Sequence, residues 1–310
     1  MSDIVISEFI DEAAIAETFA GRDVLYDPAL VDKPAELAAA LADCRALLVR
    51  NRTQVRGALL EAAPNLKVVG RLGVGLDNID MDACAARGIE VRPANGANDL
   101  SVAEYVITAA MMLLRRAWLS TDKVIAGEWP RMAMIGRELD GKRIGLVGFG
   151  AIARLTAAKA RGLGMTIAGY DPFLPEDHAA WAGVERLDLK TLLAASDVVS
   201  LHTPLTAETR RMIDTAAIAA MKPDAILINT ARGGVVDEAA LCAALKAGKL
   251  GGAALDVFET EPVTAASGVT FQGVPNLILT PHIAGVTDES NVRVSAVTAK
   301  AVAEVLDRGV

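Results

Sequence analysis

Cysteine, histidine and aromatic residues are all scarce in this chain of 310 residues. The three cysteines are scattered, without metal-ligand spacing or a disulfide framework, which indicates a reducing compartment. Aromatic residues make up 4% of the chain, so the cores that its 52% hydrophobic content allows are aliphatic. No apolar run approaches the roughly 18 residues of a membrane span, and the N-terminus lacks the features of a signal peptide. We therefore expect a cytoplasmic protein without a membrane partner.

Long runs of charge of one sign are also missing. The net charge is −8, from 31 basic and 39 acidic residues. This balance argues against a nucleic-acid partner, and we expect no metal site. The length suits two domains of roughly 150 residues each.

The middle of the chain contains a glycine-rich turn. A short apolar run, 144–147, predicts a buried strand, and Gly148, Gly150 and Ala153 follow it at the spacing G-x-G-x-x-A. Gly148 allows a tight turn, and Gly150 lets a pyrophosphate approach the backbone. The first free N–H groups of the following helix then face that anion; they begin at Ala151 and Ile152.

An acidic residue supports reading this turn as a dinucleotide site. A second predicted strand, 165–170, leads to Asp171, which lies 171 − 150 = 21 residues beyond Gly150. An acid at about this distance binds the adenosine ribose hydroxyls. Its charge would repel a 2′-phosphate, which favours NAD over NADP. An ordinary glycine turn is the alternative, but the strand, the helix and the acid together favour the nucleotide.

Strands and helices alternate on both sides of this turn. Alternation of this kind predicts parallel sheets covered by helices. Residues 101–126 interrupt it with one long apolar helix, either part of a subunit interface or simply a buried interdomain helix. Six parallel strands are expected after residue 142, and a final helix, 287–306, is expected to return to the first domain.

The predicted fold class is therefore α/β, with two doubly wound parallel-sheet domains. A Rossmann NAD domain, residues 99–285, is inserted in a discontinuous flavodoxin-like substrate domain, residues 1–98 and 286–310. We expect the active-site cleft between the two.

Polar residues follow three successive predicted strands of the nucleotide domain. Arg232 comes after the strand 225–228, and its rigid fork suits a carboxylate. Asp256 ends the next strand, with Glu261 in the loop beyond it. His282 follows the last strand, and an ordinary histidine pKa of about 6.5 suits reversible proton transfer. The alternatives are a surface arginine at 232 and a structural histidine at 282.

Five ordered motifs resemble those of the D-isomer-specific 2-hydroxyacid dehydrogenase family, which includes 3-phosphoglycerate dehydrogenase. They are 147–152, 201–206, 229–234, 256–258 with 261–262, and 281–285. The resemblance implies a homodimer joined through the nucleotide domains. Ala153 departs from the family's usual glycine, with little effect expected. The implied cofactor-binding residues are Gly148, Gly150, Ala151, Ile152, Asp171, His202, Pro204, Thr209, Ala231, Asp256 and Gly285.

The same resemblance implies a mechanism of hydride transfer between nicotinamide and C2 of a D-configured 2-hydroxy acid. Arg232, Glu261 and His282 would be the catalytic arginine, glutamate and histidine. His282 would exchange the hydroxyl proton, Glu261 would orient the imidazole, and Arg232 would grip the substrate carboxylate. Further implied substrate-binding residues are Val74 and Gly75, through their backbone, and Asn98.

Two arginines of the first domain indicate a second anion on the substrate. Arg50 and Arg52 follow the predicted strand 46–49. A similar Arg-x-Arg-Thr segment of bacterial phosphoglycerate dehydrogenases lies near the substrate phosphate. Arg131 is a further substrate-binding candidate, contributed by a partner subunit. The alternative is that these arginines are solvated or pair with local acids.

The second anion is expected to be a sulfonate or a phosphate. Segments 49–56 and 70–80 look like those of (S)-sulfolactate dehydrogenases, which favours oxidation of (S)-sulfolactate to 3-sulfopyruvate. The alternative is a 3-phosphoglycerate dehydrogenase or another 2-hydroxyacid or 2-ketoacid reductase. An alternative of another class is a non-catalytic protein that senses NAD(H).

Overall fold

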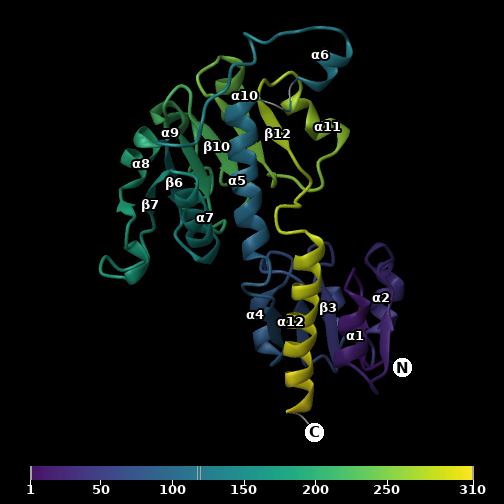
Figure 1. The fold of residues 1–310 in the computed structure, drawn as a ribbon. Helices are drawn as coiled ribbons and strands as arrows, with labels where there is room; N and C mark the ends of the chain where they lie inside the picture. The colour runs from purple at the N-terminus through teal and green to yellow at the C-terminus, as the bar shows by residue number, and fades with distance from the viewer. Residues whose placement is uncertain (1, 117, 119, 309–310) are drawn as a thin grey trace. The chain divides into compact units, whose positions relative to one another are not determined.

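The chain forms two compact units, each built on a parallel sheet (Figure 1). The computed structural model describes residues 2–116, 118 and 120–308. Unit 1 comprises Met1–Asn98 with Val286–Val310, and unit 2 comprises Asp99–Gly285. The predicted fold class, with two doubly wound parallel sheets, is confirmed.

The sheet of unit 1 has the strand order β2-β1-β3-β4-β5, with every pair parallel. Its central strands are buried on both faces: Ile4 and Ile6 enter one core, and Val5 enters the core on the other face. The strands are β1 Ile4–Ile6, β2 Val24–Tyr26, β3 Ala46–Val49, β4 Val68–Arg71 and β5 Glu90–Pro93.

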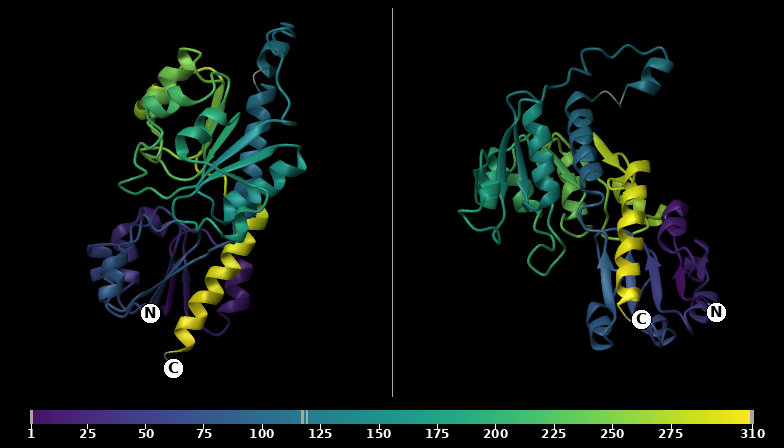
Figure 2. Two further views of the ribbon diagram at one scale, coloured as in Figure 1. Left: turned by 90° about the vertical axis from the view of Figure 1, so that its left-hand side faces the viewer. Right: turned by 60° about the horizontal axis from the view of Figure 1, so that its bottom comes forward.

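Helix α12 covers one face of this sheet together with α1, and α2 to α4 cover the other. A Cβ on Gly70 of β4 would lie 2.6 Å from Val302, so α12 approaches the strand at a glycine. Figure 2 shows α12, in yellow, running beside the strands of unit 1. The helices are α1 Glu12–Thr18, α2 Pro34–Ala40, α3 Ala58–Glu61, α4 Met81–Ala86 and α12 Asp288–Asp307, with a 3-10 turn η1 at Leu30–Asp32.

The sheet of unit 2 has the order β12-β11-β10-β9-β6-β7-β8. The prediction of six strands was wrong, because β8 adds a seventh beside β7. Its two residues are exposed and polar, so no apolar pattern indicated it. The strands are β6 Arg143–Val147, β7 Thr166–Tyr170, β8 Glu185–Arg186, β9 Val198–Leu201, β10 Ile226–Asn229, β11 Gly252–Leu255 and β12 Leu277–Leu279.

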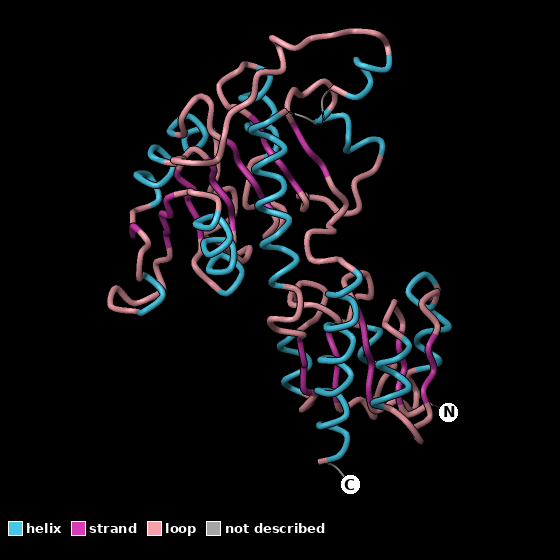
Figure 3. The backbone as a smooth tube through the Cα atoms, viewed as in Figure 1, coloured by secondary structure: helices cyan, strands magenta, loops and turns pink. Residues whose placement is uncertain are grey.

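Helices cover both faces of this sheet as well. Figure 3 shows the helices, in cyan, on both sides of the strands. One core joins α5 and α7 to the strands, and the other joins α8, α9 and α10. Among the helices that the structure describes, none is long and apolar enough to cross a membrane. Their bounds are α5 Asp99–Arg115, α6 Thr121–Ile125, α7 Ala151–Gly162, α8 Leu189–Ala195, α9 Thr215–Ala220, α10 Glu238–Lys246 and α11 Ala265–Gly268, with 3-10 turns η3 Ala179–Trp181 and η4 Val269–Phe271.

The prediction of one helix over 101–126 was wrong. Helix α5 ends at Arg115, and Arg116 takes a left-handed backbone conformation, with φ +53°. The short helix α6 buries none of its residues and projects from the rest of unit 2 (Figure 1). The helix therefore ends where its core contacts end. Residues 117 and 119 of the predicted helix lie outside the described residues.

Candidate active site

The glycine turn after β6 leaves room for a ligand at the start of α7. Gly148 has φ +86°, and a Cβ there would lie 2.7 Å from the carbonyl oxygen of His202. Gly150 caps α7 without a side-chain hydrogen bond, and a Cβ at this position would have no protein atom within 4 Å. Ala153 is fully buried against the strands. The first N–H groups of α7 therefore face open space, which suits a pyrophosphate.

Asp171 lies at the end of β7, beside the glycine turn. Its Oδ2 accepts a hydrogen bond from the N–H of Phe149 at 2.9 Å. Its Oδ1 accepts from the N–H groups of Phe173 and Leu174, at 2.9 and 3.2 Å. A carboxylate has about four acceptor positions, so these bonds leave capacity for a ribose hydroxyl. Asp171 thus also holds the turn in shape, which the sequence did not indicate.

Glu261 and His282 form a hydrogen-bonded pair. Glu261 Oε2 lies 2.8 Å from His282 Nδ1, and Oε1 accepts from the N–H of Phe258 at 2.9 Å. Burial alone would raise the pKa of Glu261. The hydrogen bond and charge of His282, the Phe258 N–H and the charge of Arg232 together lower the pKa below its ordinary value. The glutamate is therefore ionised and accepts a hydrogen bond from Nδ1–H of His282, and Nε2 is the ring nitrogen that Glu261 does not bind.

The loop that carries His282 is held by Asp256. His282 has φ +57°, and its N–H donates to the carbonyl oxygens of Asp256 and Thr280, at 2.9 and 3.0 Å. The Asp256 carboxylate, 1% exposed, accepts from the N–H groups of Ile283 and Ala284, both at 2.8 Å, and from the Thr280 hydroxyl at 2.6 Å. Burial raises the pKa of Asp256. In this structure its carboxylate positions the histidine loop, and its contact with a cofactor stays a prediction.

The loop after β10 carries Arg232 and is held in shape by hydrogen bonds of Asn229. Asn229, 1% exposed, accepts from the N–H of Ala231 and donates to the carbonyl of Arg232, both at 3.0 Å. A Cβ on Gly233 would lie 1.7 Å from the carbonyl oxygen of Phe258, so glycine alone lets this loop approach the loop of Glu261. Arg232, Glu261 and His282 therefore gather at the carboxyl ends of three neighbouring strands.

Two threonine hydroxyls near these loops are buried without a hydrogen-bond partner among the described residues. They are Oγ1 of Thr203 and Oγ1 of Thr230. Leaving such a group unpaired costs about 1–3 kcal/mol, which a bound ligand would offset. Sequence reasoning missed both residues, although they stand next to His202 and Ala231 in the motifs it used. Together with the open space at Gly150, they fit a nucleotide cofactor.

Comparison with known proteins identifies the family. A profile of the D-isomer specific 2-hydroxyacid dehydrogenase, NAD binding domain, matches residues 107–284. The chain belongs to the D-isomer specific 2-hydroxyacid dehydrogenase family. This 2-hydroxyacid dehydrogenase is NAD-dependent, and the predictions of family, enzyme class and cofactor are confirmed.

Relatives of this 2-hydroxyacid dehydrogenase differ in substrate. An (S)-sulfolactate dehydrogenase of Chromohalobacter salexigens is 57% identical over 299 residues, 96% of each chain. A D-3-phosphoglycerate dehydrogenase of Archaeoglobus fulgidus is 41% identical over 255 residues, 82% of this chain but 48% of its own. The chain thus spans about half the length of that relative. A D-lactate dehydrogenase of Aquifex aeolicus, complexed with NAD and lactic acid, superposes with a TM-score of 0.84 at 30% identity, covering 99% and 96% of the chains.

His202 and Thr209, two predicted cofactor residues of the dehydrogenase, have contacts within its own fold. His202 Nε2 lies 3.0 Å from the Ser200 hydroxyl, and enclosure of the imidazole by protein lowers its pKa to about 4. His202 is therefore neutral at physiological pH. The Thr209 hydroxyl donates to the carbonyl of Pro204 at 2.6 Å and closes the loop 204–209.

The predicted substrate loop at Val74 and Gly75 is shaped by a buried arginine. Arg71, 9% exposed, donates to the carbonyl oxygens of Leu72 and Gly75, both at 2.8 Å. A Cβ on Gly73, where φ is +145°, would lie 2.1 Å from this guanidinium. Sequence reasoning missed Arg71, because a charged residue inside a strand pattern gives no sign of its burial.

The remaining predicted substrate residues belong to both units. Asn98 ends the first segment of unit 1, and its side-chain oxygen is buried without a partner among the described residues. Arg131 is exposed in unit 2, between α6 and β6. Arg50 and Arg52 follow β3 in unit 1. Arg52 pairs with the acid Asp32, whereas Arg50 donates to the side chain of Asn291. Their contact with a substrate stays a prediction.

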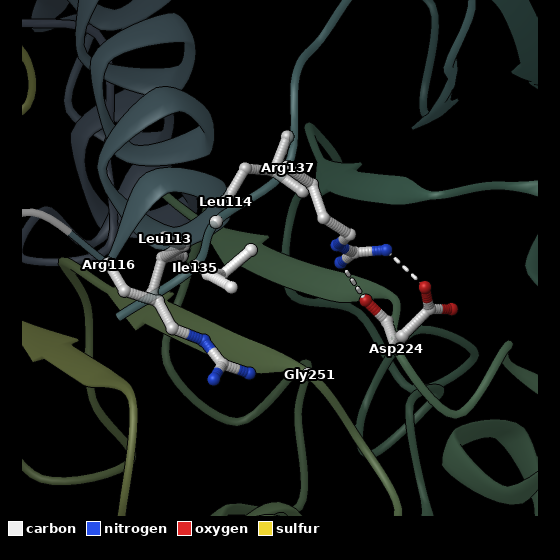
Figure 4. Close-up of a pocket in the computed structure, with 8 residues that line it drawn as sticks. Leu113, Leu114, Arg116, Ile135, Arg137, Asp224 and Gly251 are labelled. Atoms are coloured by element: carbon white, nitrogen blue, oxygen red, sulfur yellow. Dashed lines mark hydrogen bonds and ion pairs between the residues drawn. The ribbon is translucent and has the colours of Figure 1, made fainter. Parts of the chain in front are cut away.

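A cavity of about 180 Å³ in unit 2 contains none of the predicted site residues (Figure 4). Arg137 contacts both the side chain and the carbonyl oxygen of Asp224 along it. Asp224 and Gly251 lie just before β10 and β11, at the end of the sheet opposite to the loops of Arg232, Glu261 and His282. This cavity is therefore separate from the candidate active site.

Proposed function

We propose that this dehydrogenase interconverts (S)-sulfolactate and 3-sulfopyruvate. The proposal is supported by the 57% identity to a relative of that name over nearly its full length. It is also supported by the loop after β3, which carries Arg50 and Arg52 in a chain of net negative charge. Sulfolactate carries a carboxylate at C1 and a sulfonate at C3, and two cationic side chains suit its two anionic groups.

The observation that carries the proposed chemistry is the 2.8 Å contact between Glu261 and His282. His282 Nε2 takes the proton of the C2 hydroxyl during oxidation and returns it during reduction. Glu261 keeps the imidazole oriented and stabilises its charged form. When bound, NAD accepts the hydride that leaves C2, and NADH supplies it in the reverse direction.

Arg232 binds the substrate carboxylate and polarises the oxygen on C2. Its planar fork suits a bidentate contact, and its loop is held by Asn229 and Gly233. Backbone N–H groups of Val74 and Gly75 and the side chain of Asn98 are further contacts for the substrate in this proposal. Fixed cationic and N–H groups of this kind stabilise charge that develops at the oxygen.

The cofactor would be held by the turn at Gly148 and Gly150, by the first N–H groups of α7 at Ala151 and Ile152, and by Asp171 at the ribose. The hydroxyls of Thr203 and Thr230 are additional candidates, because both are buried without a partner among the described residues. The other proposed contacts are His202, Pro204, Thr209, Ala231, Asp256 and Gly285.

3-Phosphoglycerate is the second candidate substrate, supported by the relatives that bear its name. Measuring kcat/KM for (S)-sulfolactate, 3-phosphoglycerate and D-lactate with NAD distinguishes the candidates. We expect the order sulfolactate, phosphoglycerate, lactate. If kcat/KM is higher for 3-phosphoglycerate than for (S)-sulfolactate, 3-phosphoglycerate is the substrate. If no acid of a broad panel of hydroxy acids is turned over, a non-catalytic NAD(H) sensor is favoured.

We also propose a homodimer joined through unit 2. Large apolar side chains are exposed around α6: Ile125 by 79%, Trp129 by 80% and Met132 by 77%. Exposed apolar patches of this kind mark interfaces. Arg131 lies among them, so a second copy of the chain would cover it. Sedimentation equilibrium is expected to give a mass of twice the chain mass of 32.4 kDa. The substitution Trp129→Glu is expected to lower the measured mass toward that of a single chain. A monomeric wild type contradicts the proposal.

We propose that the enzyme works in the cytoplasm. The three cysteines are free thiols and buried, and burial raises the pKa of Cys44 to about 12. Unpaired thiols are typical of reducing compartments. Fractionation of cells that produce the protein is expected to leave the dehydrogenase activity with the cytoplasmic fraction, and recovery from a membrane or secreted fraction contradicts this.

A further inference from the structure

Glu8 holds the backbone of the loop that carries the two arginines. Glu8 lies two residues beyond the end of β1 and is 5% exposed. Its Oε1 accepts hydrogen bonds from the N–H groups of Arg50 and Thr53, at 2.9 and 3.0 Å. Its Oε2 accepts from the N–H of Arg52 at 3.2 Å. One buried carboxylate thus binds three N–H groups of a four-residue loop.

Asn78 holds the same loop through its carbonyl groups. Asn78 is 5% exposed, and its Nδ2 donates to the carbonyl oxygens of Arg50 and Thr53, at 2.9 and 2.7 Å. Glu8 follows β1 and Asn78 lies between β4 and α4, and the two side chains contact opposite hydrogen-bonding groups of the loop. The backbone of Arg50 to Thr53 is therefore fixed before any ligand binds.

The side chain of Arg50 is committed to the fold. Its Nε donates to the carbonyl of Phe9 and its guanidinium donates to Asn291 Oδ1, both at 2.8 Å. The guanidinium also lies 5.1 Å from the centre of the Phe9 ring, a cation–π distance. Burial lowers the pKa of Arg50. Moving this side chain to a substrate would break all three contacts.

The side chain of Arg52 faces solvent instead. It is 58% exposed, and its guanidinium contacts the carboxylate of Asp32, which is itself 64% exposed. An ion pair this exposed contributes little to stability. A second anion that binds Arg52 therefore displaces a weak partner, whereas Arg50 would lose two hydrogen bonds and a cation–π contact.

We propose that Glu8 is a positioning residue that presents Arg52 to the second anionic group of the substrate, while Arg50 supports the loop. The inference rests on the proposed function, since it concerns how a doubly charged hydroxy acid is selected. It divides the roles of two arginines that the sequence treats alike. It also assigns a role to the carboxylate of Glu8, which lies 42 to 45 positions before the loop residues whose N–H groups it binds.

Glu8→Gln tests the proposal with a change of one atom. The amide oxygen can still accept from Arg50 and Thr53, where two N–H groups converge. The amide nitrogen then faces the N–H of Arg52, and two donors cannot bond each other. The variant therefore loosens Arg52 in particular. The matched control is Glu61→Gln, the same exchange at an exposed position of unit 1.

The experiment measures kcat and KM for (S)-sulfolactate and D-lactate with saturating NAD. For Glu8→Gln we expect KM for sulfolactate to rise roughly tenfold, the loss of about one charge-assisted contact, with kcat and the lactate constants nearly unchanged. Arg52→Gln is expected to lose at least as much. The double variant is expected to match Arg52→Gln alone, because Glu8 acts through Arg52.

Equal losses for sulfolactate and lactate, or additive effects in the double variant, overturn the proposal. If Glu8→Gln fails to fold, the two arginine variants test the proposal. Arg50→Gln should lower Tm and leave the preference for sulfolactate over lactate unchanged. Arg52→Gln should leave Tm unchanged and reduce that preference. Failure of the proposed function is seen separately, in a wild type that does not prefer a doubly charged acid. In that case the inference fails with it.

Discussion

At the scale of single residues, the proposed catalytic histidine, His282, depends on partners that fix its orientation. Glu261 binds Nδ1 of His282, and the backbone of His282 is held by Asp256 in a left-handed conformation. Of the three histidines, His282 alone combines an ionised carboxylate partner with a place at a strand end near Arg232. This combination is the reason for proposing His282, rather than His178 or His202, as the histidine that exchanges the proton.

Removing His282 tests this role. We expect His282→Ala to lower kcat by roughly 10²- to 10⁴-fold, the usual contribution of a general acid–base group, while binding of NADH stays unchanged. Glu261→Gln should reduce kcat less, since the imidazole remains. The control is His178→Ala, an exposed histidine that caps η3. Activity of His282→Ala close to that of wild type would assign the proton transfer to another group.

The pairing of Arg52 with Asp32 leads to a gain-of-affinity prediction. Asp32→Asn removes the carboxylate that competes with a substrate anion, and we expect KM for (S)-sulfolactate to fall about two- to fivefold, in keeping with the weakness of exposed ion pairs. The constants for D-lactate should not change. Glu36→Gln, which alters another exposed acid of unit 1, pairing with Lys33, controls for overall charge. An equal fall in KM in both variants would show a general electrostatic effect.

At the scale of elements, parallel strands bring the reactive groups together. Arg232, Glu261 and His282 follow β10, β11 and β12, which are neighbours in the sheet, and the nucleotide turn follows β6, where the strand order reverses. Ligands of doubly wound sheets bind at such a reversal. The two glycines of this turn have different roles, because one is enclosed by protein and the other faces open space.

Alanine substitutions should separate these roles. Gly148→Ala places a Cβ 2.7 Å from a carbonyl oxygen at a positive φ, and we expect it to cost about 1–3 kcal/mol of stability, seen as a lower Tm. Gly150→Ala meets no protein atom and should leave Tm unchanged, yet raise the Kd for NAD. Calorimetry and fluorescence titration measure the two effects. Unchanged NAD affinity in Gly150→Ala would place the pyrophosphate elsewhere.

At the scale of the whole molecule, the partly buried and neutral His202 makes stability depend on pH. The pKa of His202 is lowered to about 4 from an ordinary 6.5. The unfolded chain therefore binds a proton below about pH 6.5 that the folded chain does not bind until pH 4. This contribution to stability is complete above pH 6.5 and is lost as the pH falls toward 4.

Urea unfolding at two pH values measures this effect. Between pH 7 and pH 5 the free energy of unfolding of the wild type should fall by up to about 2 kcal/mol more than that of His202→Gln. The exposed His178→Gln serves as the control and should follow the wild type. An identical pH dependence in His202→Gln would mean that the imidazole is protonated in the folded chain at pH 5.

Much of the fold and of the candidate site could be predicted because its signals are local. Apolar runs indicated the central strands, and glycine spacing with Asp171 indicated the nucleotide turn. The strand β8 was missed because its pairing partner lies outside the local pattern, and the end of α5 was missed because loss of packing terminates it. Arg71, Glu8, Asn78, Thr203 and Thr230 were missed because burial and hydrogen-bond partners arise between distant segments.

The sequence by itself determined the family, the α/β class, the preference for NAD and the strand ends at which the candidate reactive residues stand. These follow from short-range spacing, which backbone geometry translates directly into turns and strand ends. Only the tertiary structure decided which charged side chains are accessible to a ligand and which are held by the fold. Arg50 and Arg52 look equivalent in sequence, yet one is tied to Phe9 and Asn291 and the other is exposed. The availability of a charge depends on its three-dimensional neighbours, and a linear pattern carries no record of them.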